Sequence, residues 1–201
     1  MSKISSYAND STPNLSDKLI GTDVDNMNAT KNFTIAQVVG LANANLTATQ
    51  VLNGVSTAIQ APSALNSPIV VSFGAAQGSS STPVQIDAGG TITFNEAGLY
   101  IVNGFGAVER QGSSGGTAYF LFRGTLNGTQ VTATKAFHIA STNVSTPYEV
   151  TIPFQANAGD LFRFEVMRDS AGTNAGGLYP TTTLGGWGVA PSSQIQIWKL
   201  N

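Results

Sequence analysis

The sequence predicts a mainly β chain, an antiparallel sandwich preceded by an extended N-terminal arm and a short helix. From residue 67 onward, apolar and polar residues alternate in short runs bounded by Gly, Pro, Asn and Ser, which is typical of strands joined by tight turns. Before residue 33, large apolar residues are few and Ser, Asn, Asp and Thr are many. That stretch cannot bury enough surface to fold by itself.

A short helix is predicted directly after this N-terminal stretch. Thr34 is a suitable N-cap, and Ile35, Val38, Val39 and Ala42 follow with the spacing of one helix face. The pattern indicates about three turns. Because isolated helices of that length are marginal in water, we expect the apolar stripe to dock on a partner or on another copy of the chain.

The organisation predicted along the chain has three parts. Residues 1–45 form the extended arm and helix, 46–66 form a connector, and 67–201 form the sandwich. The connector is assigned because Asn53-Gly54 interrupts any helix and favours a turn between short extended pieces.

Six runs of the sandwich read as strands: 67–74, 91–109, 117–128, 146–155, 159–169 and 193–201. In the fifth run, Phe162, Phe164 and Val166 share one face, because successive side chains of a strand point to opposite sides. In the last run Ile195 and Ile197 do the same. Each of these strands therefore has one core side and one polar side.

Composition excludes several classes of function. Charged residues make up 10% of the chain, the formal charge is −2 and the pI is about 5.2, so no basic surface is available for nucleic acid. The chain has no cysteine, which excludes disulfides and thiolate chemistry. The first residues lack the apolar run of a secretory signal, and no segment has the roughly 18 apolar residues of a membrane span. We expect a chain made in the cytosol, without membrane insertion.

Motifs for chemistry are incomplete. Ser114 lies in a G-x-S-x-G pattern, but strands flank it on both sides and no acid lies between it and His138, the one histidine. Asp23 and Asp25 begin like a calcium loop, yet Met27 and Asn28 occupy later positions where such a loop needs a ligand and a glycine. We expect no catalytic residues, no metal site and no cofactor.

The segment 170–193 is long and rich in Gly and Thr, and it carries Tyr179 and Trp187. Loops of that length without structure of their own are uncommon and often functional. Aromatic rings among small polar residues suit sugar rings or a protein epitope, so these two residues are the ligand-binding candidates. The alternative is that they close the end of the sandwich or the seam of a trimer.

The order of motifs in the sandwich resembles a known fold. An Ala97-Gly98-x-Tyr100 strand start is followed by an Asn-Gly turn at 127–128, a Gly-Asp turn at 159–160 and a C-terminal strand. This order resembles the jelly roll of tumour-necrosis-factor-like and complement-type globular heads over about residues 70–201. The chain departs from it in ending on "IWKLN". The resemblance implies an antiparallel jelly-roll sandwich, a homotrimer, and Tyr100 as a trimer-interface residue at the axis.

The N-terminal stretch has a resemblance of its own. "LIGTD" at 19–23 and "NATKNFT" at 28–34 resemble the leader of many tailed-bacteriophage virion proteins, in which these blocks precede a variable distal domain. The resemblance implies that the leader anchors the chain to a particle. The particle-anchor candidates are its apolar residues and those of the helix: Leu19, Ile20, Val24, Phe33, Ile35 and Val38.

Together these observations predict a non-enzymatic structural protein located in the virion, either a trimeric head fibre or capsid decoration, or a tail-associated appendage. Its expected partners are further copies of itself and other virion proteins of the capsid, neck or tail. A host-surface glycan is a candidate ligand. The alternative is a free-standing, lectin-like carbohydrate-binding module with no particle.

Overall fold

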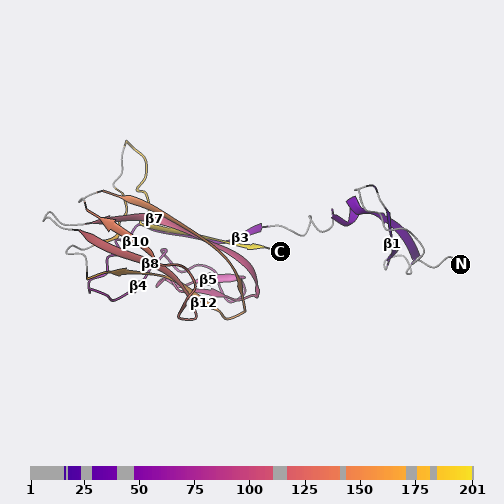
Figure 1. The fold of residues 1–201 in the computed structure, drawn as a ribbon, viewed down its shortest axis with the longest axis horizontal. Coiled ribbons are helices and arrows are strands. Elements are labelled where there is room, and N and C mark those ends of the chain that lie inside the picture. Colours follow the sequence, from indigo (N-terminus) through magenta and orange to yellow (C-terminus); the bar gives the residue numbers. More distant parts are fainter. Residues whose placement is uncertain are drawn as a thin grey trace. The chain divides into compact units, whose positions relative to one another are not determined.

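The structure is a computed structural model that describes residues 16, 18–23, 29–39, 48–110, 117–140, 144–170, 176–181 and 185–200. The chain divides into two units, residues 1–47 and residues 48–201. Figure 1 shows both units. No helix among the described residues is long and apolar enough to cross a membrane.

The first unit contains a hairpin and a helical turn. β1 (Lys18–Asp23) pairs antiparallel with β2 (Ala29–Thr34), and residues 35–39 are helical. The N-terminal stretch that was predicted to be extended therefore forms a hairpin. The N-cap prediction is confirmed, because Thr34 Oγ1 accepts a hydrogen bond from Gln37 N at 3.1 Å and Gln37 Oε1 accepts one from Thr34 N at 2.9 Å. This reciprocal pair is a capping box. Ala42 lies outside the described residues.

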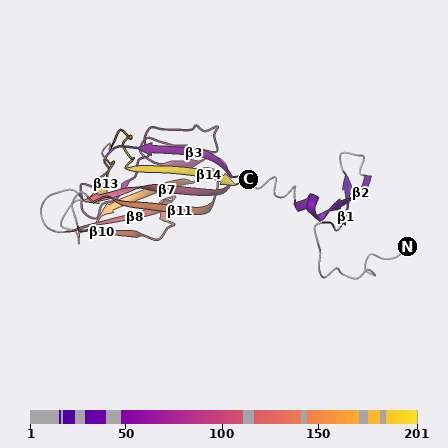
Figure 2. The same cartoon turned by 90° about the horizontal axis from the view of Figure 1, so that it is seen from above.

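The second unit is built of antiparallel strands in two sheets. Figures 1 and 2 label most of the strands. Their bounds are β3 (Ala48–Ser56), β4 (Ile69–Val70), β5 (Val84–Ile86), β6 (Ile92–Phe94), β7 (Gly98–Arg110), β8 (Ala118–Leu126), β9 (Thr129–Gln130), β10 (Lys135–Ile139), β11 (Thr146–Ala156), β12 (Leu161–Arg168), β13 (Gly176–Leu178) and β14 (Ser193–Leu200).

The strand order identifies the fold. One sheet has the order β11-β7-β14-β3, seen side by side in Figure 2, and the other has the order β10-β8-β12-β6-β5. If β3, β6, β7, β8, β10, β11, β12 and β14 are numbered one to eight, the two sheets read 1-8-3-6 and 2-7-4-5. This is the order of two Greek keys wrapped into a jelly roll. The predicted jelly-roll sandwich is confirmed, and β14 is a central strand of its sheet.

The sandwich begins earlier than the sequence predicted. β3 lies within the predicted connector 46–66, yet it pairs along its length with β14. The Asn53-Gly54 dipeptide is not a turn but part of this strand. A Cβ on Gly54 would lie 2.9 Å from the backbone oxygen of Phe73, so the glycine permits close approach of a neighbouring segment. The correction therefore moves the start of the sandwich from residue 67 to residue 48.

The core lies between the two sheets, and its largest fully buried side chains are aromatic. Phe162, Phe164 and Val166 are buried and alternate with half-buried polar residues, as predicted. Ile195 and Ile197 are fully buried on β14. The face assignments made from alternation are therefore confirmed for both strands.

Two turns at one end of the sandwich are joined through Asp160. Asn127 and Gly128 have φ of 50° and 80° and connect β8 to β9 by a two-residue hairpin turn of type I′, as the Asn-Gly pair predicts. Asp160 Oδ1 accepts a hydrogen bond from Asn127 Nδ2 at 2.8 Å, and its Oδ2 accepts one from Asn157 N at 2.8 Å. The hydrogen bond from the Asn157 backbone, followed by that from the Asn127 side chain, lowers the pKa of Asp160 below its ordinary value.

We predict that Asp160→Asn lowers the midpoint of urea unfolding at neutral pH. A carboxyl whose folded-state pKa is depressed contributes stability above its unfolded pKa and loses it as the pH falls through the folded pKa. The difference in urea midpoint between wild type and variant should therefore shrink once the pH drops below 3.8, the ordinary pKa of an aspartate. Urea titrations across this range measure the gap. An equal gap at neutral and strongly acidic pH would mean that the carboxylate charge contributes nothing.

Candidate functional site

The outward face of the β11-β7-β14-β3 sheet carries several large apolar side chains and little charge. On β7, Leu99, Ile101 and Phe105 point outward while Tyr100 and Val102 point into the core. Register places Trp198 of β14 beside Ile101. Leu99 is exposed, whereas Ile101, Phe105 and Trp198 are half-buried. A strand that is apolar on both sides is typical of a sheet that is covered on both faces.

Four cross-strand rows cover this face. From one end to the other they are Val55-Gln194-Phe105-Glu149, Asn53-Gln196-Asn103-Thr151, Gln50-Trp198-Ile101-Pro153 and Ala48-Leu200-Leu99-Gln155. Among these described positions, Glu149 carries the only charged side chain. Every row also contains polar side chains, and near the groove Asn103 Nδ2 donates to Glu149 Oε1 at 3.4 Å and Thr151 Oγ1 donates to Asn103 Oδ1 at 3.3 Å. These hydrogen bonds are long and therefore weak, which leaves their oxygens able to accept from a partner. We call the four rows the apolar sheet face.

An open groove of about 780 Å³ lies at one end of the apolar sheet face. Its walls come from two sources, the outward side of β7 and β11 and the two feet of a loop. Its lining includes Phe105, Ala107, Pro147, Thr181, Ala190 and Pro191. Glu149 and Asn103 also line it, so the groove combines apolar walls with hydrogen-bond acceptors.

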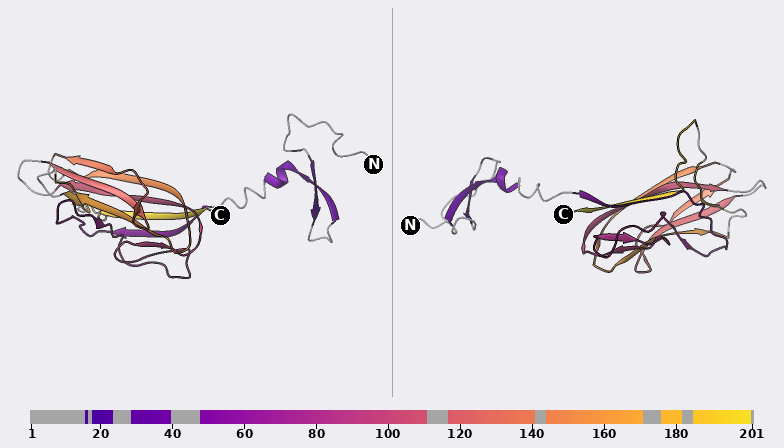
Figure 3. Two further views of the ribbon diagram at one scale, coloured as in Figure 1. Left: turned by 60° about the horizontal axis from the view of Figure 1, so that its bottom comes forward. Right: turned by 180° about the vertical axis from the view of Figure 1, so that it is seen from behind.

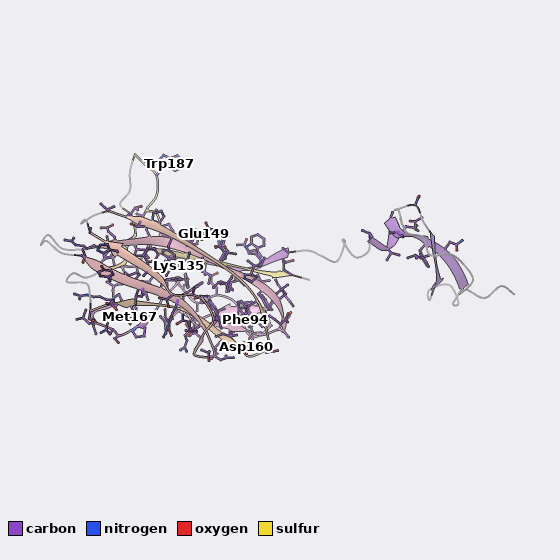
Figure 4. All side chains as sticks on the ribbon, in the orientation of Figure 1. Phe94, Lys135, Glu149, Asp160, Met167 and Trp187 are labelled. Carbon is purple, nitrogen blue, oxygen red and sulfur yellow. The ribbon has the colours of Figure 1, made fainter. Side chains whose placement is uncertain are left out.

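The loop beside the groove carries Trp187, which is 83% exposed. We call residues 181–191 the arm; the structure describes 181 and 185–191 of it. Figure 4 shows Trp187 on a loop that stands away from the sandwich, and the right view of Figure 3 shows this loop from behind. The base of the arm is held by hydrogen bonds from Thr181 N to Ala190 O at 3.1 Å and from Ala190 N to Thr181 Oγ1 at 3.2 Å.

The second ligand-binding candidate, Tyr179, is not displayed. Its side chain is 9% exposed, and its backbone N donates to Ala107 O at 3.2 Å. Burial, followed by the nearby Glu109 carboxylate, raises the pKa of Tyr179. The predicted long loop also contains β13, which pairs with β7 and draws the following residues into the sandwich. Of the two predicted aromatics, Trp187 alone is presented to solvent.

The prediction that Tyr100 lies in a trimer interface is wrong. Its side chain is fully buried within the protomer, with its ring 4.7 Å from that of Phe94. Its hydroxyl donates to the backbone oxygen of Glu96 at 2.9 Å. A residue with no exposed surface cannot contact another copy. Its outward neighbours Leu99 and Ile101 lie on the face that can.

The structure brings two of the particle-anchor candidates together. Leu19 of β1 lies directly opposite Phe33 of β2, and cross-strand neighbours in such a register share one side of the hairpin. Leu19 is 47% and Val38 44% exposed, while Phe33 and Ile35 are half-buried. The remaining candidates are Ile20, whose backbone lies in β1 opposite Asn32, and Val24, which lies outside the described residues.

The other chemical candidates form no site. His138 is an exposed residue of β10 whose ring stacks on Tyr119 at 4.6 Å. Ser114 lies outside the described residues. Arg123 binds Glu165 through Nε at 2.8 Å and through a terminal nitrogen at 2.7 Å, beside a small pocket of about 280 Å³. In the described part of the chain, no group of three or more His, Cys, Asp or Glu side chains is placed to hold a metal ion.

Comparison with known proteins finds weak similarity to solved structures. No protein-family model and no curated protein matches the chain. Among solved structures, the chain is similar to rabbit GITRL, at 14% identity over 59% of this chain and 77% of that one, with a TM-score of 0.33. It is also similar to two crystal structures of murine APRIL, at 13% identity over 77% of this chain and all of the other, with TM-scores of 0.43 and 0.40. Both are ligands of the tumour-necrosis-factor family.

Proposed function

We propose that this chain is a non-enzymatic structural protein of a tailed-bacteriophage virion. In this proposal the first unit attaches to the particle, and the jelly roll faces outward as a homotrimeric fibre, decoration or tail-associated appendage. The observation that carries the proposal is the division of the chain into a small apolar-bearing unit and an independent sandwich. An isolated two-stranded hairpin is marginally stable in water, so the first unit needs a surface to lie on.

The phage assignment is supported by the "LIGTD" and "NATKNFT" blocks, whose described residues lie in β1 and β2 of the hairpin. The non-enzymatic assignment is supported by the way in which acidic groups of the sandwich are engaged. Glu165 pairs with Arg123, Glu96 pairs with Lys199, and Asp160 joins two turns. None of these three arrangements presents two carboxylates side by side for acid–base chemistry.

The homotrimer is supported by the apolar sheet face. A face that exposes or half-exposes Leu99, Ile101, Phe105 and Trp198 with a single carboxylate gains free energy when it is covered. A second copy supplies the same low-charge surface, and three copies around an axis close the assembly without leaving an unpaired face.

We predict that the double variant Leu19→Ala/Phe33→Ala no longer attaches to particles. Each lost side chain removes about 1.5–3 kcal/mol if it is buried on the particle, which corresponds to about a tenfold to hundredfold loss of affinity per side chain, and each leader loses two. Attachment is measured by co-sedimentation with particles assembled without the wild-type chain. Because three leaders of a trimer act together, the loss of affinity for the trimer should be larger than the loss for one leader.

The matched control is Asn32→Ala, a polar and exposed change on the same strand as Phe33. It should attach as the wild type does. Thermal unfolding of the sandwich should be unchanged in both variants, since the two units are separate. Normal loading of the double variant would refute the anchor. A lowered melting temperature of the jelly roll would instead assign the leader to the fold.

The second candidate function is a free-standing carbohydrate-binding module, which is favoured by the exposed ring of Trp187. Binding measurements with the full-length chain distinguish the two functions. Binding to a glycan array that disappears in Trp187→Ala, together with no sedimentation on particles, would support the module. Particle attachment without glycan binding would support the virion protein.

A further inference from the structure

We propose that the arm of each copy seats Trp187 in the groove of a neighbouring copy. This inference rests on the proposed homotrimer and names the contact that locks it. Trp187 is 83% and Val189 45% exposed, whereas most large apolar residues of the sandwich are buried. A tryptophan offers a large apolar surface with one hydrogen-bond donor, a combination enriched at the centre of protein interfaces.

The arm is anchored so that its tip stands free. On one side Leu178 is fully buried, and on the other side Ser192 is fully buried and donates through its hydroxyl to Ser56 O at 3.0 Å and Ala58 O at 2.6 Å. Gly185 and Gly186, just before Trp187, have φ of 58° and 83° and no atom within 4 Å of an added Cβ. The base is therefore fixed, and the bend at the tip depends on glycine.

The groove matches the indole chemically. Phe105, Ala107 and Pro147 supply apolar walls, while Glu149 and Asn103 supply acceptors for the indole N–H. Glu149 is partly engaged, since its contact with Asn103 is 3.4 Å long. The segment 181–191 carries no charged residue. When it enters a groove that holds one carboxylate, it therefore buries no charge of its own and is not repelled.

A second copy is the occupant that this arrangement favours. Thr181, Ala190 and Pro191 at the feet of the arm also form a wall of the groove, so arm and groove lie at the same end of the same face. The arm of one copy points out of its own groove, as its exposure shows, while the groove stays open. In a ring, each arm reaches forward into the next groove, and three such head-to-tail contacts close the assembly.

The test uses the absence of cysteine from the natural chain, which makes introduced thiols unambiguous. Gly188→Cys places a thiol on the arm and Pro147→Cys places one on the far wall of the groove. The two single variants of the full-length chain are mixed, allowed to exchange and oxidised. We expect a covalent heterodimer that contains one copy of each variant. The control replaces Pro147→Cys with Leu121→Cys, on the other sheet, and should give no heterodimer.

Two further measurements complete the test. In a Trp198→Phe background, the fluorescence of Trp187 should shift to shorter wavelength as the protein concentration rises through assembly. Trp187→Ala should raise the concentration of half-assembly by about tenfold or more, while Val131→Ala, an equally simple loss from an exposed site, should leave it unchanged.

The outcomes separate the two proposals. A trimer by sedimentation without the heterodimer or the fluorescence shift would overturn the arm contact and leave the trimer intact. A monomer at every concentration would overturn both. Glycan binding that depends on Trp187 in a trimer lacking the cross-link would assign the arm to a ligand instead of to a second copy.

Discussion

Phe164→Ala should lower the free energy of unfolding of the jelly roll by about 3–5 kcal/mol, the range for removing a fully buried phenylalanine. Phe164 is fully buried on β12, and its ring lies 4.9 Å from that of Phe122, 5.0 Å from Phe162 and 6.1 Å from Phe73. A domain with a total stability of about 5–15 kcal/mol would lose a large part of it.

The loss cannot be repaired locally, because the opposing sheet is shaped around this ring. A Cβ on Gly104 of β7 would lie 2.8 Å from Phe164 Cε2. Gly104 therefore leaves space that the ring fills. Gly104→Ala should destabilise the wild type and be better tolerated in a Phe164→Leu background, so a double-mutant cycle should give a clear coupling energy.

Urea unfolding at one fixed protein concentration measures these effects, since self-association makes apparent stability depend on concentration. Leu161→Ala is the control, because this residue of the same strand is exposed. It should change the free energy of unfolding by about 0.5 kcal/mol or less. A loss below about 1 kcal/mol for Phe164→Ala would contradict the core described above.

Ile101→Lys should convert the proposed trimer into monomers without unfolding the protomer. Ile101 lies in the middle of the apolar sheet face, with Trp198 and Pro153 as its cross-strand neighbours. Leaving an unpaired charge in a buried interface costs about 3–5 kcal/mol, which corresponds to a factor of a hundred to several thousand in the equilibrium constant. In the monomer the ammonium group remains in water, so the fold itself should be nearly unaffected.

Sedimentation at low micromolar concentration and thermal unfolding measure the two quantities. Leu121→Lys is the matched control, because Leu121 is a half-buried, outward-facing strand residue of the other sheet. It should leave both the mass and the melting temperature unchanged. If Ile101→Lys still assembles as the wild type does, the apolar sheet face is not the surface that joins the copies.

Much of the sandwich could be predicted from the sequence because local patterns determine it. Alternation placed Phe162, Phe164 and Val166 inside, since a strand with one covered side needs this period. The Asn127-Gly128 turn was predictable because few residue pairs adopt two successive positive φ angles. Thr34 as N-cap was predictable because a hydroxyl at that position satisfies a free backbone N–H.

The candidate site was less predictable. Trp187 stood out as an aromatic in a polar loop, but Tyr179 in the same loop is drawn inward by β13, a strand of three residues with no local signature. The groove joins residues of β7, β11 and the arm that are far apart in the chain, and no motif links them. The available signal was the strand 98–110, which carries apolar residues at both parities.

The sequence by itself determined the class of fold, the capped helical turn, the hairpin turn at Asn127-Gly128 and the inward faces of β12 and β14, because each depends on neighbouring residues. The tertiary structure alone decided three further points. Gly54 is a point of close packing inside β3, because a segment containing Phe73 lies against it. Tyr100 lies inside and Ile101 outside. Both the odd and the even positions of β7 carry apolar residues, so only the pairing with neighbouring strands decides which side faces the core. Trp187 lies beside a groove, because the jelly-roll topology brings the feet of the arm against the outward side of β7 and β11.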